Sequence, residues 1–472
     1  MNKSDSERIA GYLERLGYVW TDKREKAGVV VTTTCGVRQS AEDRVYGIVP
    51  KIKKENPKAV AVVTGCLAGR TDVQKRLKES VDIWLPINDL DGLGRRLQNI
   101  VPRHPTSVIE VGCRGIRKSD SSPASRRTRN DKEGSIGGYL SINPKYESNI
   151  SAFVPIGNGC NNFCAYCVVP YARGREAYRP AEEVLAEVKS LVKKGYKEII
   201  LIAQNVNSYK SEVRNSKSET NPKSKIPASP ELQRGEQNQK LTPINFARLL
   251  KQVNSISGNF WIRFATSHPK NMSEELIETI AGCEKVCHQI HLPAQAGDNE
   301  VLKRMNRKYT REHYLGFLKK IRAAMPDASI STDVIVGFPG ETKQQFKNTE
   351  KLFRQAKFDM AFIAQYSPRP GTAAARFKDD VMKREKKRRE EALTKILRQT
   401  ALTNNKKYLG KTVEVMIDGR KNEVRFGKTK TGKNVKVKTG VNGKMRIGDI
   451  VKVKIDAVKE FNLSGTAARS LK

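Results

Sequence analysis

Three cysteines stand close together in the segment GCNNFCAYC, where Cys160, Cys164 and Cys167 have C-x3-C-x2-C spacing. A [4Fe–4S] cluster normally takes four cysteines, so three would leave one iron open to a substrate or cofactor. The apolar and aromatic residues inside the segment favour a shielded cluster, because a dry shell tunes its potential. A zinc site with a distant fourth ligand and a loop with incidental cysteines are the alternatives. Zinc sites more often pair C-x2-C units or include His.

Two more cysteines follow predicted buried strands near the start of the chain. The β-branched segments Gly28–Thr34 and Ala59–Gly65 end at Cys35 and Cys66, and a helical pattern follows each. This alternation predicts a parallel α/β unit, whose ligands bind at the carboxyl ends of the strands. We therefore expect both thiols to be metal ligands, and the helix N-termini after them favour negative charge. The alternative is that both are small buried hydrophobic residues.

The remaining three cysteines have weaker patterns. Cys283 and Cys287 lie near the end of a predicted helix, where core packing is the better interpretation. Cys113 begins a polar segment and is a poor candidate for a ligand.

Composition limits the kind of partner. The chain has 472 residues, with 88 Lys and Arg against 50 Asp and Glu, for a formal net charge of +38. Such an excess indicates a polyanionic partner, by default RNA or DNA. No apolar run approaches the roughly 20 residues that span a bilayer, and the first residues have no signal-peptide pattern. We expect a cytoplasmic protein that does not interact with membranes.

The predicted elements divide the chain into an α/β protein with several domains. Residues 1–110 form the α/β unit, and residues 111–149 read as a flexible linker rich in Ser, Arg, Gly and Lys. Repeated strand–helix units over 150–400 predict a full or partial (β/α) barrel. Within it, the polar stretch 210–240 is predicted to be a disordered insertion. Short alternating strands over 405–470 predict a small β-barrel.

Several segments of the sequence resemble a known family. The cysteine spacing resembles the radical S-adenosylmethionine superfamily, and GCNNFCAYCVVPYARGRE looks like its methylthiotransferase family. Segments TTTCGVRQSAEDR and VTGCLA near the start are similar to the same family. So are five later segments: Asn205–Tyr209, His291–Gly297, Leu302–Thr310, Ser331–Thr342 and Tyr366–Thr372. The C-terminal barrel resembles the TRAM module, an RNA-binding barrel. QNVNSY and YSPRPGT point to the branch that acts on tRNA.

The resemblance implies an N-terminal parallel α/β domain, a central partial radical-SAM barrel and a C-terminal TRAM barrel. It implies two [4Fe–4S] clusters and S-adenosylmethionine as cofactors, and tRNA as partner. The open iron would chelate S-adenosylmethionine, whose reductive cleavage gives a 5′-deoxyadenosyl radical. That radical would take hydrogen from C2 of N6-dimethylallyladenosine at position 37 of tRNA. Sulfur from an auxiliary site and a methyl group from a second S-adenosylmethionine would complete the methylthio group.

Two other functions stay open at this point. One is a related methylthiotransferase that acts on threonylcarbamoyladenosine in tRNA or on an aspartate of a ribosomal protein. The other is a non-enzymatic RNA-binding protein with a structural metal loop. The electron donor and the sulfur source are not identified by the sequence, and we expect a monomer.

The chain departs from the family at its start. Family members begin with a strand and a Gly-Cys-Gln-Met-Asn-like segment that supplies the first of three auxiliary cysteines, and Cys35 and Cys66 match the other two. This chain begins at Met1 with a capping box at Ser4 and no strand before it. We expect that the N-terminal domain lacks its first strand and that the auxiliary cluster is incomplete.

Five residues near the carboxyl ends of predicted barrel strands are candidates for cofactor or substrate contact. They are Gln204, Ser267, Gln295, Asp333 and Gly337. Barrels of this kind place their active sites at that end. Gly337 begins a GFPG segment that would let the backbone approach the nucleoside of S-adenosylmethionine, and a plain turn is the alternative. No catalytic residue is assigned.

For several other charged residues and two histidines, a role in binding is weighed against a structural or solvated role. Arg173 and Arg175 follow the cysteine segment, where they either meet a carboxylate or phosphate or belong to a solvated loop. For His268 and His291 a structural role is the better interpretation. The basic run Lys383–Arg389 either contacts RNA or is a solvated face.

Overall fold

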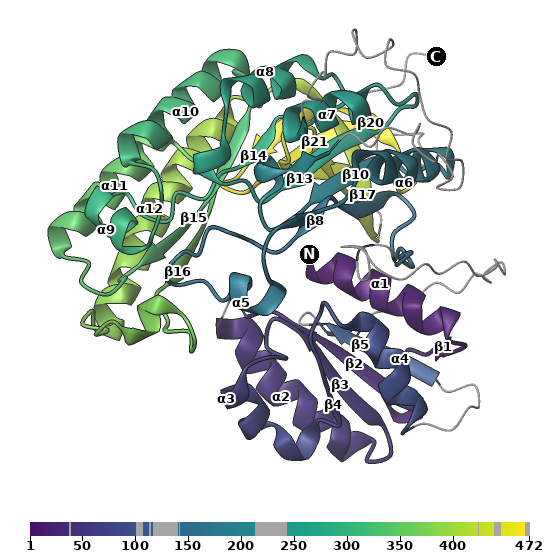
Figure 1. Ribbon diagram of the computed structural model, residues 1–472. Helices are drawn as coiled ribbons and strands as arrows, with labels where there is room; N and C mark the ends of the chain where they lie inside the picture. Colours follow the sequence, from purple (N-terminus) through teal and green to yellow (C-terminus); the bar gives the residue numbers. More distant parts are fainter. Residues whose placement is uncertain are drawn as a thin grey trace, which may run out of the picture.

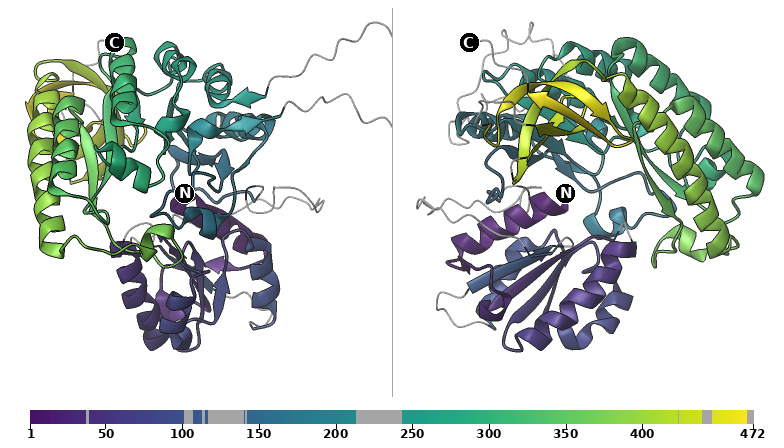
Figure 2. Two further views of the ribbon diagram at one scale, coloured as in Figure 1. Left: turned by 60° about the vertical axis from the view of Figure 1, so that its left-hand side comes forward. Right: turned by 180° about the vertical axis from the view of Figure 1, so that it is seen from behind.

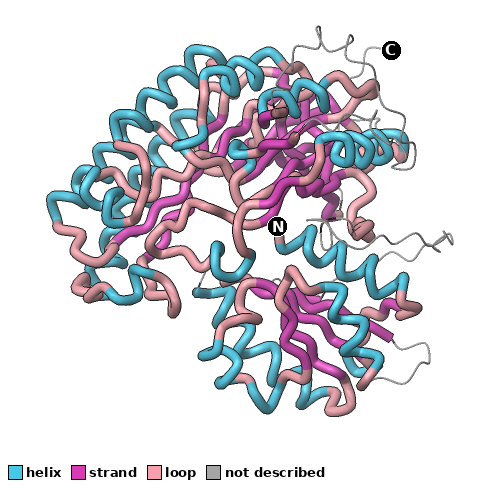
Figure 3. Tube along the Cα trace, in the orientation of Figure 1, coloured by secondary structure: helices cyan, strands magenta, loops and turns pink. Residues whose placement is uncertain are grey.

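Three domains follow one another along the chain. The computed structural model describes residues 1–36, 39–100, 107–112, 115–116, 140, 142–212, 243–422, 424–438 and 445–467. The N-terminal domain lies below the central domain in Figure 1, and the short helix α5 (Val169–Arg173) lies at the junction between them. Strands lie inside each domain and helices lie mostly outside (Figure 3).

The N-terminal domain is a parallel sheet with helices on both faces. Its strand order is β1-β5-β2-β3-β4, with β6 (Gly115–Ile116) antiparallel to β5. The other strands are β1 (Val19–Trp20), β2 (Val29–Thr34), β3 (Val60–Gly65), β4 (Ile83–Leu85) and β5 (Ser107–Gly112). The helices are α1 (Asn2–Arg15), α2 (Gln39–Glu55), α3 (Thr71–Arg76) and α4 (Leu90–Gln98). Helices α1 and α4 share one apolar cluster, and α2 and α3 share another.

The place beside β2 is taken by a strand that the sequence analysis did not predict. β5 pairs with β2 in parallel, from Val29 with Val108 to Thr33 with Gly112. The backbone groups of β2 on this side are therefore paired. The strand runs two residues past position 110, into the region predicted to be linker.

The predicted linker over 111–149 and the predicted insertion over 210–240 lie mostly outside the described residues. At the linker's end, Leu140 and Ile142 are buried against α1, where Arg8 donates to both of their carbonyl oxygens. At the start of the insertion, the short strand β11 (Lys210–Ser211) pairs with β12 (Ile244–Asn245).

The central domain is an open barrel of six parallel strands. β7 (Ser151–Pro155), β10 (Glu198–Ile202) and β13 (Trp261–Ala265) form one sheet, and β14 (Gln289–His291), β15 (Ser329–Val336) and β16 (Met360–Gln365) form the other. A parallel bridge between Ile262 and Val286 links the two sheets. The predicted partial barrel is confirmed.

Helices cover the outside of this barrel because each strand alternates between two environments. On β15, Ile330, Thr332, Val334 and Val336 are buried toward the helices, and the residues between them are half-buried toward the barrel interior. The covering helices are α6 (Ala181–Lys193), α7 (Phe246–Asn254), α8 (Glu274–Gly282), α10 (Arg311–Ala324), α11 (Lys343–Ala356) and α12 (Lys383–Lys406). The short helix α9 (Asn299–Arg304) was not predicted.

The C-terminal domain is the predicted small β-barrel. Its five strands close in the order β17-β18-β19-β21-β20. They are β17 (Thr412–Lys421), β18 (Val424–Thr429), β19 (Asn434–Lys438), β20 (Ile450–Val458) and β21 (Asn462–Ala467). Inward-facing residues such as Val415, Val435 and Val453 fill its core.

The C-terminal barrel packs against the amino ends of the central strands. Arg263 on β13 donates to Glu198 at 2.6 Å and to the carbonyl oxygens of Thr429 at 2.8 Å and Lys430 at 3.0 Å. Trp261, Cys287 and Met416 form a small apolar cluster across the same seam. Figure 2 shows this barrel on the side of the central domain away from the N-terminal domain. The two added domains therefore cover opposite ends of the central barrel.

No helix within the described residues is both long enough and apolar enough to cross a membrane.

Replacing Arg263 by Met should destabilise the protein. The change leaves the buried Glu198 carboxylate without its cation and two carbonyl groups of the C-terminal barrel without a donor. Removing one member of a buried ion pair costs about 3 kcal/mol or more. We expect a lower urea midpoint than for the wild type. Lys436→Met, on the exposed face of β19, is the matched control, and equal midpoints for the two variants would contradict the role of Arg263.

Candidate functional site

The predicted cysteine loop leaves the carboxyl end of the first barrel strand. It follows β7 and β8 (Gly157–Asn158) and runs directly into α5. The loop is closed by backbone hydrogen bonds from Cys160 N–H to Gly174 O at 3.1 Å and from Cys167 N–H to Cys164 O at 2.9 Å. Asn306, at the end of α9, also donates to the carbonyl oxygen of Phe163 at 2.8 Å. The loop is therefore held at both its base and its tip.

The three cysteines of this loop are half-buried. Burial raises the pKa of Cys167 to about 12, and the thiols of Cys164, Cys160 and Cys66 add to the effect. Burial also raises the pKa of Cys160, whose sulfur accepts a hydrogen bond from Asn162 Nδ2 at 3.4 Å. No three His, Cys, Asp or Glu side chains in the described part of the chain form a preassembled metal site. Metal ligands of this kind must lose their protons on binding.

A buried arginine faces these thiols. Arg307 donates to Cys164 Sγ at 3.3 Å, to Tyr309 Oη at 2.8 Å and to the carbonyl oxygen of Pro293 at 3.1 Å. Burial lowers the pKa of Arg307, but Tyr309, Tyr166 and Cys164 raise it more, so the guanidinium stays charged. Arg307 forms no ion pair with a carboxylate of the described residues. A buried cation needs an anion nearby, so this environment fits a negatively charged group held by the thiols.

The sequence analysis did not single out Arg307, although it quoted the segment Leu302–Thr310 that contains it. This segment holds four basic residues, and nothing in the local sequence distinguishes Arg307 from the other three. Its contact with Cys164 spans 143 positions and is visible only in the folded chain.

The two cysteines of the N-terminal domain lie at the sheet edge that faces this loop. Cys35 follows β2 and is half-buried, and Cys66 follows β3 and is buried. A Cβ atom added at Gly36 would lie 3.2 Å from Cys66 Cβ and 3.1 Å from Val168 Cγ2. Because Val168 directly follows Cys167, the structure brings both groups of cysteines to one junction. Cys113 lies outside the described residues.

Buried ion pairs hold the two domains together around this junction. Arg173, at the end of α5, pairs with Asp5 of α1, and both side chains are almost fully buried. Arg173 also donates to Asn158 Oδ1 at 3.2 Å, and Asn88 donates to the carbonyl oxygen of Arg173 at 3.1 Å. Arg173 was expected either to meet a carboxylate or phosphate or to belong to a solvated loop. In the structure it meets a carboxylate, that of Asp5 of the same chain. Arg175 is exposed.

A second contact between the domains comes from the segment Tyr366–Thr372. Arg369 donates to Glu42 Oε2 at 2.9 Å and to Gln39 Oε1 at 2.7 Å on α2. Burial lowers the pKa of Arg369, while Glu42 and Cys35 act in the opposite direction. A motif of the central domain is therefore fixed beside Cys35.

Three predicted contact residues lie in the loops that follow barrel strands β10, β13 and β14. Gln204 follows β10, Ser267 follows β13, and Gln295 forms an isolated bridge with Val334 of β15. The amide atoms of Gln204 and the hydroxyl of Ser267 are buried and have no hydrogen-bond partner in the described structure. Gln295 and Thr266 adopt left-handed backbone conformations, with φ of 65° and 71°. Unpaired buried polar atoms are costly, so a polar ligand at this end of the barrel would satisfy them.

Asp333 lies in the middle of β15 rather than at its end. Its carboxylate is 3.1 Å from His291 Nε2, and His291 Nδ1 is 3.0 Å from Ser331 Oγ. The exposed ring of Phe362 lies 6.0 Å from the His291 ring. These groups line the barrel interior below the mouth. His291, interpreted as structural, is therefore half-exposed beside a predicted contact residue.

Gly337 is closely packed. Its N–H donates to Glu341 Oε2 at 2.6 Å, and the aliphatic part of Lys386 fills the space that a Cβ atom would need. Its φ of 67° explains the glycine. The structure thus gives the GFPG turn a packing role.

His268, Cys283 and Cys287 have the structural roles predicted for them. Burial, with Arg307 and Lys270, lowers the pKa of His268 to about 2, and its Nδ1 accepts the Lys270 N–H at 3.1 Å. Cys283 belongs to the main apolar core and Cys287 to the seam with the C-terminal barrel.

Three family models match the chain. The model of the Radical SAM superfamily matches residues 154–353, that of the Uncharacterized protein family UPF0004 matches 1–86, and that of the TRAM domain matches 406–468. A solved radical S-adenosylmethionine methyltransferase, TsrM from Kitasatospora setae, is 15% identical. Its match covers 74% of this chain and 63% of that chain, with a TM-score of 0.46.

The curated relatives cover nearly the whole chain. The tRNA-2-methylthio-N(6)-dimethylallyladenosine synthase of Clostridium botulinum (strain Hall) is 40% identical over 98% of this chain and 94% of its own length. The protein of the same name from Carboxydothermus hydrogenoformans is 37% identical over 98% and 96%.

The family models show that the central barrel is a radical S-adenosylmethionine domain and that the C-terminal barrel is a TRAM domain. The chain belongs to the methylthiotransferase family that includes the tRNA-2-methylthio-N6-dimethylallyladenosine synthases. The resemblance seen in the sequence is confirmed. Membership implies an enzyme with a [4Fe–4S] cluster and S-adenosylmethionine, and it leaves the non-enzymatic alternative without support.

Replacing Arg307 by Met should make the reduction potential of the bound iron–sulfur centre more negative. The guanidinium contributes a positive charge and a hydrogen bond to Cys164, and both stabilise the more reduced, more negative state. We expect a shift on the order of tens of millivolts, measured by spectroelectrochemical titration. Lys308→Met, at the exposed neighbouring position, is the control. An unchanged potential in Arg307→Met would exclude this role.

The pH dependence of stability should reflect the neutral, buried His268. Its pKa of about 2 in the folded protein lies below the usual 6.5, so the unfolded chain binds the additional proton. Stability should therefore fall as the pH drops below about 6.5, by up to about 1.4 kcal/mol per pH unit from this group. His268→Gln should flatten the profile of melting temperature between pH 7 and 5. The exposed His313→Gln is the control, and identical profiles for wild type and His268→Gln would contradict the assignment.

Proposed function

We propose that this enzyme attaches a methylthio group to C2 of N6-dimethylallyladenosine at position 37 of tRNA. The observation that carries this proposal is the match over 98% of the chain to relatives that bear the corresponding name. The match includes all three domains, and a TRAM domain beside a chain of net charge +38 suits an RNA substrate.

The thiols of Cys160, Cys164 and Cys167 would hold the [4Fe–4S] cluster. Two features support this assignment: one loop supplies all three thiols, and the buried Arg307 guanidinium donates to one of them, Cys164. When bound, the cluster supplies the electron that cleaves S-adenosylmethionine and leaves one iron for its amino and carboxylate groups. The loop fixes where the thiols lie, and Tyr166 within it packs against the main apolar core.

Gln204, Ser267 and Gln295 would contact S-adenosylmethionine or the nucleoside at the barrel mouth. The unpaired atoms of Gln204 and Ser267 offer both a donor and acceptors for a polar ligand. Asp333, with His291, would contact whatever enters the barrel interior. Gly337 acts by allowing the turn that brings Glu341 and Lys386 together.

Cys35 and Cys66 would serve an auxiliary cluster. Their position at the same junction as the other three cysteines supports this role. Two thiols are too few for a [4Fe–4S] cluster, and the described part of the N-terminal domain contains no third cysteine. Cys35 and Cys66 alone therefore do not fit a complete [4Fe–4S] cluster, and no chemical step is assigned to an auxiliary cluster.

The test is mass spectrometry of tRNA nucleosides from a host that lacks its own enzyme. We expect 2-methylthio-N6-dimethylallyladenosine only when this gene is expressed. Cys160→Ala, Cys164→Ala and Cys167→Ala should each abolish the product and the formation of 5′-deoxyadenosine, because three ligands leave no spare.

Cys283→Ala, which removes a core thiol outside the loop, is the matched control and should keep the product. Methylthiolated threonylcarbamoyladenosine, or a modified ribosomal aspartate, would replace the proposed substrate with a related one. Normal 5′-deoxyadenosine formation by any of the three loop variants would disprove the ligand assignment.

A further inference from the structure

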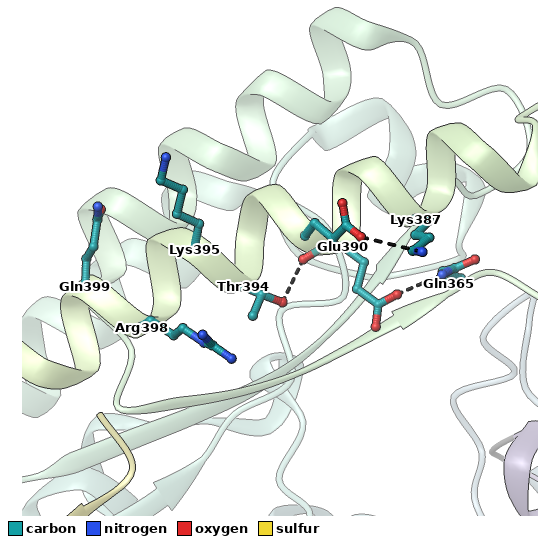
Figure 4. Close-up of a pocket in the computed structure, with 8 residues that line it drawn as sticks. Gln365, Lys387, Glu390, Thr394, Lys395, Arg398 and Gln399 are labelled. Carbon is teal, nitrogen blue, oxygen red and sulfur yellow. Dashed lines mark hydrogen bonds and ion pairs between the residues drawn. The ribbon is translucent and has the colours of Figure 1, made fainter. Parts of the chain in front are cut away.

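An open groove runs along the long helix α12 on its way from the barrel mouth to the C-terminal barrel. It has a volume of about 570 Å³ and lies between α12 and Gln365, the last residue of β16 (Figure 4). All of its lining side chains are polar or charged, and they include Lys387, Lys395 and Arg398. A groove with no hydrophobic or aromatic residue in its lining is unlike the usual site for a small organic ligand.

The positive charge of the groove is available to an outside partner. The acceptor Glu390 is engaged by Gln365 Nε2 at 2.8 Å, and Glu391 lies 3.9 Å from Lys387 in an exposed pair. Lys395 and Arg398 have no ion pair with any described residue, and both are exposed. Exposed cations that the protein itself does not neutralise are the expected feature of a phosphate-binding surface.

The helix presents these cations on a fixed support. On its opposite side, Leu393, Ile396 and Leu397 are buried in the main core. At its start, the buried Arg389 pairs with Glu341 at 2.7 Å. Because the backbone is anchored along its length, the spacing of the exposed cations is set before a ligand arrives, which lowers the entropy cost of binding.

The two ends of α12 connect the two places that an RNA substrate must reach. Near its start, Lys386 packs against Gly337 at the barrel mouth. At its end, Asn405 donates to the carbonyl oxygens of Lys459 at 2.7 Å and Glu460 at 3.0 Å in the C-terminal barrel. The 24 residues of α12 span roughly 36 Å at 1.5 Å per residue. A chain that contacts both ends must pass along this helix or across the barrel.

The groove also lies at the open side of the barrel. β16 is the last strand in the order β14-β15-β16, so its far edge pairs with no described strand. Phe362 on this strand is exposed although its ring approaches His291 in the interior. A nucleoside attached to a backbone in the groove would therefore have a direct way into the barrel.

We propose that the α12 groove binds the sugar–phosphate backbone of the tRNA whose nucleoside enters the barrel, with Lys395 and Arg398 contacting phosphates. This inference rests on the proposed tRNA substrate. It assigns an RNA contact to the central domain in addition to the TRAM barrel.

The test compares binding of a tRNA carrying N6-dimethylallyladenosine at position 37 to two double variants. Lys395→Gln with Arg398→Gln should raise Kd about tenfold and reduce the slope of log Kd against log salt by about 1.4 to 1.8. Lys189→Gln with Lys319→Gln removes the same charge from the exposed faces of α6 and α10 and should stay within about twofold of wild type. Melting temperatures verify that both variants are folded, as expected for exposed side chains.

Equal affinities and salt slopes for the two double variants would overturn the groove, whether or not the wild type makes the methylthio nucleoside. If the wild type makes no such product yet the groove variant alone loses affinity, the proposed function fails and the groove stands as an RNA-binding surface. Charge reversal at one position, Lys395→Glu, changes the net charge by the same two units and should also weaken binding, and unchanged binding would count against the groove.

Discussion

The arrangement of this enzyme depends on burying charged groups at the junction between its first two domains. The loop that carries Cys160, Cys164 and Cys167 continues into Arg173, which is almost fully buried against Asp5 of the N-terminal domain. Arg369 pairs with Glu42 in the same way from the other side of the barrel. A buried ion pair tolerates little displacement, because separating its members leaves each charge unsolvated. These pairs therefore fix the cysteine loop relative to the sheet edge that carries Cys35 and Cys66.

Each end of the open central barrel is covered by one of the other two domains. At the amino ends of the strands, Glu198, Arg263 and Gln289 form a polar layer that the turn of the C-terminal barrel covers through two backbone carbonyl groups. At the carboxyl ends, the N-terminal domain covers the cysteine loop. The far edge of β16, which pairs with no described strand, is the side of the barrel that neither added domain covers.

Short-range patterns predicted most of the fold, and long-range contacts explain what they missed. The β-branched runs before Cys35 and Cys66 and the strand–helix repeats after Ser151 correspond to observed elements, because periodicity reports burial directly. The pairing of β5 with β2 was missed, since it joins segments almost 80 positions apart. The packing of Lys386 from α12 against Gly337 was missed for the same reason, since it joins residues 49 positions apart. The spacing of Cys160, Cys164 and Cys167 was enough to predict a metal site in this loop, whereas no pattern pointed to Arg307, which faces it.

The basic residues discussed above differ in burial and in the partners that neutralise them. Arg173, Arg263, Arg369 and Arg389 are buried, and each has a carboxylate partner inside the protein, so they hold the fold together. Lys395 and Arg398 are exposed without such a partner and face outward from a rigid helix. Arg307 fits neither group, because it is buried and its neighbours are thiol, phenol and carbonyl groups. A cation kept in that position is balanced only when the adjacent sulfur atoms carry negative charge, as thiolates bound to metal do.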